Sequence, residues 1–478
     1  MAQTFFFYDL ETSGLNPRED RIMQFAGIRT DLDLNPIGEK YNFLIKLSDD
    51  ILPSPEAILT TGITPRQTLD DGYTEAEAAK ILHDEIFTEE TIAVGYNNVR
   101  FDDEFVRHLF WRNYYDPYEW GYRDGRSRWD LLDVVRMVRA LRPDGINWPV
   151  DDDGKSTNRL ELLSKVNGLE HEKAHDALSD VEALIAVAKL IKQKQPKMWQ
   201  YLFNMRDKNA VTKLVNLREP KPFVYSSGRL NSEFNKTTIM LPVAEAKNHN
   251  LLVYDLRYDP LSLVNKTAED LENELAQWSE IHPGERPPTY VKEFKLNRCP
   301  AVAPLSVVSE ISVWQNIGLE LGAIKHNLAN LKAHPEVIPM LKKWYEQRND
   351  RWEELYSESS SERITLAESQ LYDGFIDSAD KFKTQQIPNF TQKEVADFVP
   401  DFNDKRLNDL WMGYKARSFD KLLTKQEREA WNERRSAILA PQVQSYLLKL
   451  QELAIEKGKS ASFYLEDLRL WLENLLAE

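Results

Sequence analysis

The chain has 478 residues, of which 42% are hydrophobic, and 77 acidic against 61 basic side chains leave a formal net charge of −16. This length suggests about three domains, and the composition is that of globular proteins with sizeable cores. A chain that is basic throughout is excluded, but total charge does not report its distribution, so a basic nucleic-acid groove on an acidic body remains compatible.

Cys299 is the only cysteine, so no disulfide can form within the chain, and we expect a reducing, cytoplasmic environment. Carboxylates interrupt the first apolar run, and no basic segment precedes it. No uninterrupted apolar stretch of about 18 residues occurs elsewhere. We therefore expect neither a signal peptide nor a membrane span.

Residues 1–195 alternate between strand and helix patterns. After a first strand from Thr4, strands are predicted at 21–30, 40–46 and 91–96, and helices at 74–87 and 102–113. This order predicts an α/β domain with ligands at the strand ends.

The remaining two thirds of the chain change character twice. Residues 196–222 form a connector with one helical piece, bounded by prolines. Short strand patterns with a single helix at 223–305 predict a small β-barrel, and helical patterns dominate from residue 317 onward. Residues 356–362, rich in Ser and Glu, are interpreted as a linker. The predicted domains are 1–195, 196–352 and 353–478.

The first candidate site lies where the opening aromatic strand ends, at Asp9 and Glu11. Side chains two apart in a strand share a face, so these carboxylates should point the same way. Like charges placed together repel unless a cation sits between them, and a hard divalent ion with oxygen ligands resolves the conflict. The alternative is an ordinary polar turn after a strand.

Two later motifs also carry acidic groups. Asp102 opens a helix shortly after a predicted strand, where helix capping is the alternative explanation. Asp180 lies beside the buried stripe of another helix, and a carboxylate facing inward needs a partner. His175, at that helix's entrance, has the titration range of a general base, although a single histidine is more often structural or exposed.

In this order, the three motifs resemble the proofreading-type 3′→5′ exonucleases called DEDDh. The resemblance places the five catalytic positions of that family on Asp9, Glu11, Asp102, His175 and Asp180. It implies a ribonuclease H-like α/β fold and two Mg²⁺ ions, which Mn²⁺ can replace. The ions would be held by Asp9, which bridges them, together with Glu11 and Asp180, while Asp102 acts through the second ion's shell or its waters and His175 takes a proton from the attacking water.

A closer resemblance covers most of the chain. Four segments are similar to the bacterial exodeoxyribonuclease I family, namely 96–104, 112–118, 127–133 and 140–149. That family joins the exonuclease domain to an SH3-like β-barrel and an all-helical C-terminal domain. The resemblance implies a monomer that degrades single-stranded DNA processively from its 3′ end, releases 5′-mononucleotides, and serves DNA repair and recombination.

The resemblance also assigns contacts with substrate and partner. Glu11 and Arg159 match substrate-binding positions, and Arg142 and Tyr201 match positions that bind the C-terminal tail of single-stranded DNA-binding protein. A surface salt bridge is the alternative for Arg159. Between Leu109 and Trp129, aromatic and cationic residues alternate, as in single-strand binding surfaces, with core packing as the alternative.

Several assignments stay open at this point. Asp103, Asp130, Asp133 and Asp176 compete with the chosen carboxylates, and only motif register favours Asp102 and Asp180. An enzyme of the same fold that acts on RNA, a proofreading subunit and a catalytically silent scaffold are the alternative functions.

Overall fold

The computed structural model describes residues 2–169, 177–285, 287–361 and 366–477. The chain divides into two compact units, each assembled from separated segments. The first unit combines 1–128, 171–185 and 363–478, and the second combines 129–170 and 186–362. Segments from both ends of the sequence therefore build the first unit.

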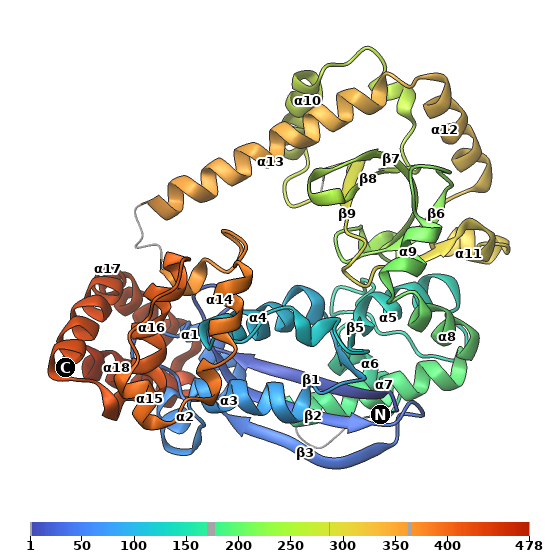
Figure 1. Ribbon diagram of the computed structural model, residues 1–478. Helices are drawn as coiled ribbons and strands as arrows, with labels where there is room; N and C mark the ends of the chain where they lie inside the picture. Colours follow the sequence, from blue (N-terminus) through green and yellow to red (C-terminus); the bar gives the residue numbers. More distant parts are fainter. Residues whose placement is uncertain (1, 170–176, 286, 362–365, 478) are drawn as a thin grey trace. The chain divides into compact units, whose positions relative to one another are not determined.

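A mixed five-stranded sheet forms the centre of the N-terminal region, with strand order β3-β2-β1-β4-β5 (Figure 1). Its strands are β1 (Thr4–Thr12), β2 (Ile22–Thr30), β3 (Pro36–Leu44), β4 (Thr91–Gly95) and β5 (Ser127–Asp130). β1 pairs with β2 antiparallel and with β4 parallel, so it lies in the middle of the sheet. Phe5, Phe6 and Phe7 are fully buried, as aromatic side chains in a central strand should be.

Two groups of helices belong to the first unit. The N-terminal group is α1 (Pro55–Thr61), α2 (Pro65–Asp71), α3 (Glu75–Ile81) and α4 (Asp102–Arg112). The C-terminal group is α14 (Ser378–Thr384), α15 (Gln392–Asp397), α16 (Lys405–Ser418), α17 (Lys425–Lys457) and α18 (Ser462–Ala477). α7 (Ala177–Lys194) begins in the first unit and ends in the second.

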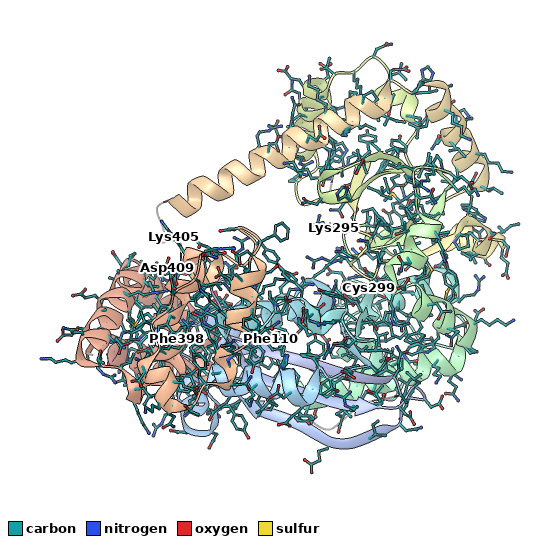
Figure 2. All side chains as sticks on the ribbon, viewed as in Figure 1. Phe110, Lys295, Cys299, Phe398, Lys405 and Asp409 are labelled. Carbon is teal, nitrogen blue, oxygen red and sulfur yellow. The ribbon has the colours of Figure 1, made fainter. Side chains whose placement is uncertain are left out.

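Apolar cores join these groups. On one face of β1, Phe6, Tyr8 and Leu10 pack with α4 residues that include Phe110. Trp111 and Tyr114, at and just beyond the C-terminal end of α4, share a core with the C-terminal helices, and Phe398 packs at the margin of this core. Figure 2 labels Phe110 and Phe398.

A third core spans the sequence from one end to the other. Met23, Leu47 and Ile58 of the N-terminal region pack with residues of α17 and α18, among them Leu468 and Leu472. The C-terminal helices thus share their hydrophobic cores with the sheet domain.

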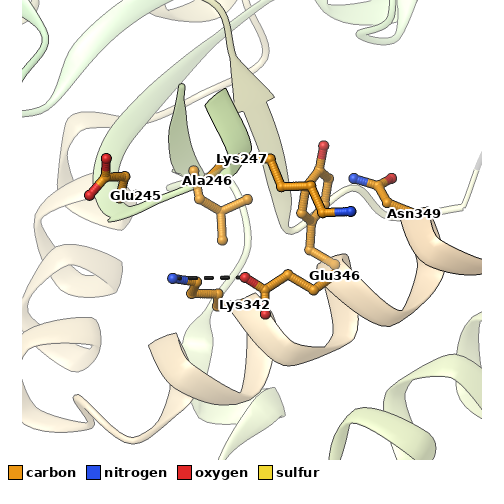
Figure 3. A pocket seen from close by; sticks show the side chains of 8 residues that line it. Glu245, Ala246, Lys247, Lys342, Glu346 and Asn349 are labelled. Atoms are coloured by element: carbon orange, nitrogen blue, oxygen red, sulfur yellow. Dashed lines mark ion pairs between the residues drawn. The ribbon is translucent and has the colours of Figure 1, made fainter. Parts of the chain in front are cut away.

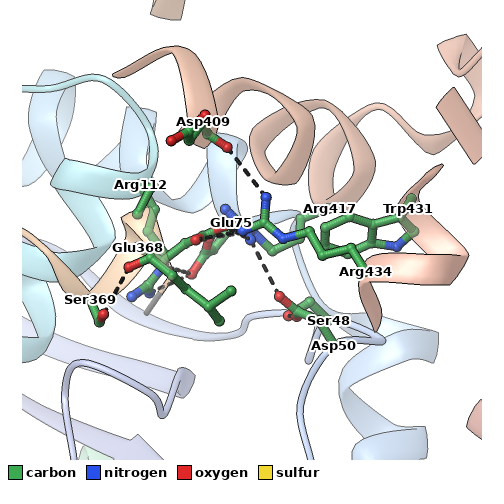
Figure 4. A network of polar contacts seen from close by, with 12 residues as sticks. Ser48, Asp50, Glu75, Arg112, Glu368, Ser369, Asp409, Arg417, Trp431 and Arg434 are labelled. Atoms are coloured by element: carbon green, nitrogen blue, oxygen red, sulfur yellow. Dashed lines mark hydrogen bonds and ion pairs between the residues drawn. The ribbon is translucent and has the colours of Figure 1, made fainter. Parts of the chain in front are cut away.

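Arginines and carboxylates form a buried cluster in the first unit (Figure 4). This arginine–carboxylate cluster comprises Arg21, Arg112, Arg417, Arg434, Asp50, Glu75 and Glu368. A guanidinium nitrogen of Arg417 lies 3.4 Å from Asp50, another lies 3.5 Å from Glu75, and the nearest to Glu368 is at 3.1 Å. The cluster therefore connects the C-terminal helices with the sheet domain through charges as well as apolar contacts.

The second unit contains an antiparallel sheet with strand order β10-β6-β7-β8-β9. Its strands are β6 (Phe223–Ser226), β7 (Thr237–Glu245), β8 (Leu251–Asp255), β9 (Val291–Phe294) and β10 (Ala301–Pro304). Its helices are α5 (Leu131–Leu141), α6 (Leu160–Val166), the end of α7, α8 (Pro196–Asn204), α9 (Lys208–Leu214), α10 (Ala268–Ile281), α11 (Ile311–Asn316), α12 (Leu321–Ala333) and α13 (Val337–Ser361).

Most predicted elements are present, with local corrections. The helix predicted at 74–87 is α3 followed by a π-helical turn at Leu82–Ile86, and the strand predicted at 40–46 starts earlier, at Pro36. β10 was not predicted, and the proposed linker at 356–362 is helical through Ser361. Among the described residues, no helix combines the length and apolar character needed to cross a membrane.

Candidate active site

Asp9 and Glu11 occupy the last part of β1, as the sequence predicted. The parallel pairing of β1 with β4 ends at Phe7, so both carboxylates lie beyond the end of the neighbouring strand. Both are partly buried, and they share one face because side chains alternate along a strand. This is the edge at which α/β sheets bind ligands.

Asp180, in the first turn of α7, meets these two carboxylates. Ligand oxygens of Asp9, Glu11 and Asp180 all lie within 4.8 Å of one another. Residues 169 or more positions apart in the sequence thus converge, which is what the metal hypothesis requires. We call these three residues the acidic trio.

The carboxylates of the acidic trio repel one another, and this repulsion affects the pKa of Asp9. Burial raises the pKa of Asp9 well above its usual value, and the charges of Asp102, Glu11 and Asp180 raise that pKa further. A bound divalent cation would reverse this effect, because it favours the ionised carboxylates. An all-oxygen donor set fits hard cations such as Mg²⁺ and Mn²⁺.

Asp102 opens α4 and is buried, with 5% of its surface exposed. It raises the pKa of Asp9, so its charge acts on the trio, as expected for a carboxylate at the edge of the site. A 3-10 turn at Asn98–Arg100 leads from β4 into α4, and Asn97 adopts a left-handed conformation with φ of 74°. This turn delivers the start of α4 to the carboxyl end of the sheet.

The structure also accounts for the competing carboxylates that it describes. Asp103 accepts hydrogen bonds from Tyr8 and Arg128, Asp130 caps α5, and Asp133 pairs with Arg136 at 2.5 Å. Each therefore has a structural role. Asp176 and the predicted general base His175 lie outside the described residues.

Gly14 follows the acidic end of β1 by two residues. A Cβ atom added there would lie 2.4 Å from the carboxylate of Asp20, which accepts a hydrogen bond from the backbone N–H of Asn16 at 2.8 Å. Close approach of this carboxylate, rather than a left-handed backbone, therefore explains the glycine.

Of the predicted substrate and partner residues, Glu11 belongs to the acidic trio of the first unit, whereas Arg159, Arg142 and Tyr201 lie in the second unit. Arg159 is exposed and pairs with Glu161 at 2.6 Å, the surface ion pair that was the alternative interpretation. Arg142 donates to the carbonyl oxygens of Leu141 and Val307. Tyr201 is half-buried, and burial raises its pKa to about 12.

The aromatic and cationic stretch between Leu109 and Trp129 is mostly structural. Its most buried aromatic residues are Phe110, Trp111, Tyr114, Trp120 and Trp129. Arg112 is fully buried against Glu75, at 2.5 Å. Core packing therefore accounts for most of this stretch, and Tyr122, 66% exposed, is its most exposed aromatic side chain.

A small pocket of the second unit lies between α13 and the turn that joins β7 to β8 (Figure 3). Ion pairs occupy polar groups of its lining, with Lys342 3.8 Å from Glu346 and Lys247 2.8 Å from Asp350. The Lys247–Asp350 pair joins the β7–β8 turn to α13, whereas the Lys342–Glu346 pair lies within α13 itself.

Sequence comparisons match three consecutive family models. They are Exonuclease over residues 6–188, Exonuclease I SH3-like domain over 206–347, and Exonuclease I C-terminal domain over 365–475. The exodeoxyribonuclease I of Haemophilus influenzae is 40% identical over 94% of this chain and 93% of its own length. That of Escherichia coli K12 is 37% identical over the same shares.

Solved structures agree with these matches. E. coli exonuclease I in complex with a dA16 oligonucleotide superposes with a TM-score of 0.89 at 35% identity, covering 99% of this chain and 100% of that one. A zinc-bound form of an E. coli ExoI–ssDNA complex gives 0.90 at 35% identity, and SSB/exonuclease I with an inhibitor gives 0.87 at 34%, both with the same coverage.

The ribonuclease H-like exonuclease domain, SH3-like domain and helical C-terminal region that the sequence predicted are thus confirmed. Together with an acidic trio at the end of β1, they show that this chain belongs to the exodeoxyribonuclease I family.

Proposed function

We propose that this protein is a 3′→5′ exodeoxyribonuclease that degrades single-stranded DNA processively, releases 5′-mononucleotides, and acts in DNA repair and recombination. The convergence of Asp9, Glu11 and Asp180 is the observation that carries the proposal. Support comes from relatives that match along nearly the whole chain and from the oligonucleotide bound to the E. coli protein.

Asp9, Glu11 and Asp180 would hold two Mg²⁺ ions, for which Mn²⁺ can substitute. Paired ions in such sites activate a water molecule and stabilise the leaving oxygen. The chain's own contribution is the fixed carboxylate geometry, with Asp102 acting from the edge of the site. The zinc-bound E. coli complex is consistent with a site that accepts divalent ions.

His175 would act as the general base that accepts a proton from the attacking water. It stands in the sequence five residues before Asp180. Loss of a general base commonly lowers the rate about 10²–10⁴-fold, so His175→Ala should do the same while metal binding persists. A pH–rate profile that His175→Ala leaves unchanged would remove this residue from proton transfer.

Substrate and partner contacts complete the proposal. Glu11 and Arg159 would contact DNA, and Arg142 and Tyr201 would bind the C-terminal tail of single-stranded DNA-binding protein, a partner that the SSB/exonuclease I structure supports. The domains are proposed as 1–195, 196–352 and 353–478, in a monomeric cytoplasmic enzyme. A titration with the tail peptide tests the partner, and absence of binding would refute it.

The decisive experiment uses end-labelled single-stranded DNA, duplex DNA and RNA of matched sequence, each with Mg²⁺ or with a chelator. We expect mononucleotides to be released from the 3′ end of single-stranded DNA only when Mg²⁺ is present. Faster degradation of RNA would favour the ribonuclease alternative, because the 2′-hydroxyl distinguishes the two substrates. Lack of any hydrolysis would favour a binding scaffold.

A further inference from the structure

Behind the acidic trio lies a buried carboxylate with three hydrogen-bond donors. Asp103 is fully buried and accepts hydrogen bonds from the Tyr8 hydroxyl at 2.5 Å, from the Asn98 side-chain amide at 3.1 Å and from the Arg128 guanidinium at 2.5 Å. We call these four residues the Asp103 cluster. Hydrogen bonds to a charged acceptor are shorter and stronger than those between neutral groups.

The cluster joins two of the three main-chain segments that carry the acidic groups of the site, namely β1 and the start of α4. Tyr8 precedes Asp9 in β1, and Asp103 follows Asp102 at the start of α4. Because neighbouring side chains of a strand point to opposite faces, Tyr8 anchors β1 from the face opposite Asp9. The Tyr8–Asp103 hydrogen bond therefore ties the strand that supplies Asp9 to the helix end that supplies Asp102.

The charge of Arg128 completes this arrangement. Asp103 adds a buried negative charge beside Asp102, and the guanidinium of Arg128 neutralises it, with an N–O distance of 2.5 Å. A buried carboxylate without such a partner would be costly. Asn98, itself fully buried, links the same carboxylate to the turn after β4.

We propose that Tyr8, Asn98 and Arg128 act through Asp103 as positioning residues for the acidic site, fixing the metal ligand Asp9 relative to Asp102. Metal ligands have to be held within about 0.5 Å of their productive geometry, which takes supporting hydrogen bonds as well as the ligands themselves. This inference rests on the proposed divalent-metal site, and it assigns the cluster a role in metal affinity beyond its contribution to stability.

Tyr8→Phe tests the inference because it deletes one hydroxyl and no charge. The matched control is Tyr114→Phe, which also deletes a buried hydroxyl, one that donates to the carbonyl oxygen of Leu407 at 2.8 Å. Tyr114 lies beyond the far end of α4 from Asp102, and the 11 residues of this helix span about 16 Å at 1.5 Å per residue. Both variants should lower the melting temperature to a similar extent.

Mn²⁺ binding to the metal-free protein, measured by titration calorimetry, separates the two roles. We expect the Kd for Mn²⁺ to rise about tenfold in Tyr8→Phe, a change of about 1.4 kcal/mol, and to stay at the wild-type value in Tyr114→Phe. Asn98→Ala should shift it in the same direction as Tyr8→Phe. In activity assays, Tyr8→Phe should raise the Mg²⁺ concentration for half-maximal rate, with KM for DNA unchanged.

Wild-type Mn²⁺ affinity in both Tyr8→Phe and Asn98→Ala would overturn the inference and leave the proposed function standing. An equal loss of affinity in Tyr8→Phe and Tyr114→Phe would also overturn it, since the effect would then be one of stability alone. Failure of the wild-type protein itself to bind Mn²⁺ would overturn the proposed metal site and the inference with it.

Discussion

Two groups of carboxylates in the first unit meet the same physical problem with opposite outcomes. In the acidic trio, burial and the neighbouring carboxylates raise the pKa of Asp9 well above its usual value. In the arginine–carboxylate cluster, burial alone would raise the pKa of Asp50, but Arg21 and Arg417 outweigh it and lower that pKa to about 2. The pKa of Glu75 is lowered in the same way, against burial, by Arg112 and Arg417.

The difference shows how one protein separates stability from function. Where arginines surround the acids, the ionised form is satisfied in the folded chain, and the group contributes to stability. Where the dominant charges are other carboxylates, the folded chain holds a repulsion that a cation can relieve. The first arrangement connects domains, and the second prepares a binding site.

Removing an acid of the trio should have the largest effect, and this effect is on the rate of hydrolysis. We expect Asp180→Asn to lower the rate of DNA hydrolysis by about 10³-fold or more, because the metal ligands are lost, while DNA binding and folding persist. Rates on end-labelled single-stranded DNA measure this. Asp70→Asn, at an exposed carboxylate of α2, is the control and should leave the rate unchanged. Near-normal activity of Asp180→Asn would contradict the assignment.

Removing an arginine of the cluster should have the largest effect on stability. Arg417 is buried and contacts Asp50, Glu75 and Glu368, so Arg417→Met should lower the free energy of unfolding by about 3–5 kcal/mol. Urea denaturation checks this. The control is Arg469→Met, which removes an exposed partner of Glu466 and should leave stability nearly unchanged. Equal effects of the two variants would show that the cluster does not stabilise the unit.

Lowering the pH should change the contributions of Asp50 and Asp9 to the free energy of unfolding in opposite directions. The pKa of Asp50 is about 2 in the folded chain and 3.8 as its ordinary value, so its contribution is present above pH 4 and is lost as the pH falls through 2. At about 1.4 kcal/mol per unit, Asp50→Asn should cost roughly 2 kcal/mol at neutral pH, and this deficit should shrink in acid.

In metal-free buffer, Asp9→Asn should behave in the opposite way. The folded pKa of Asp9 is raised, so ionising it costs stability as the pH rises through that value. The variant should therefore be more stable than the wild type at neutral pH and lose this advantage in acid. Denaturation curves at several pH values compare the two, and deficits of the same sign for Asp9→Asn and Asp50→Asn would contradict the contrast.

Metal ions should produce the smallest change in the free energy of unfolding. At ten times its Kd, Mg²⁺ should raise the free energy of unfolding by about 1.4 kcal/mol. Thermal denaturation with and without a chelator measures this. Arg417→Met should keep the Mg²⁺ response, since its cluster takes no part in metal binding, and Asp180→Asn should lose most of it. The reverse pattern would mean that the two groups are not separate.

Local sequence patterns predicted the positions of helices and strands better than they predicted which side chains of those elements are buried. On α18, the helical spacing of Leu465, Leu468, Leu472 and Leu475 predicts one apolar stripe, and all four side chains are buried. On the longer α17, the same spacing predicts a stripe of Val443, Leu447, Leu450 and Ala454. Leu447 and Ala454 are exposed there, and Tyr446 and Leu453 are buried instead. A helical repeat of 3.6 residues drifts along a long helix, so packing partners decide which stripe is covered.

The residues of the site show the same contrast between what local patterns predict and what packing decides. Asp9 and Glu11 share a face because of strand geometry, which the sequence alone contains. The choice of Asp102 over Asp103 depended on motif register, because the contact that occupies Asp103, with Tyr8, joins residues 95 positions apart. Trp111 looked like a DNA-stacking residue for a similar reason: its partners lie in the C-terminal helices.

The core shared by the two ends of the chain has a consequence for biosynthesis. Met23, Leu47 and Ile58 find their cover only when α17 and α18 leave the ribosome. At about 5–20 residues per second, the interval between Ile58 and Leu465 is on the order of 20–80 s. During that time the nascent chain carries an uncovered apolar surface, which is the kind of surface that chaperones shield on emerging polypeptides.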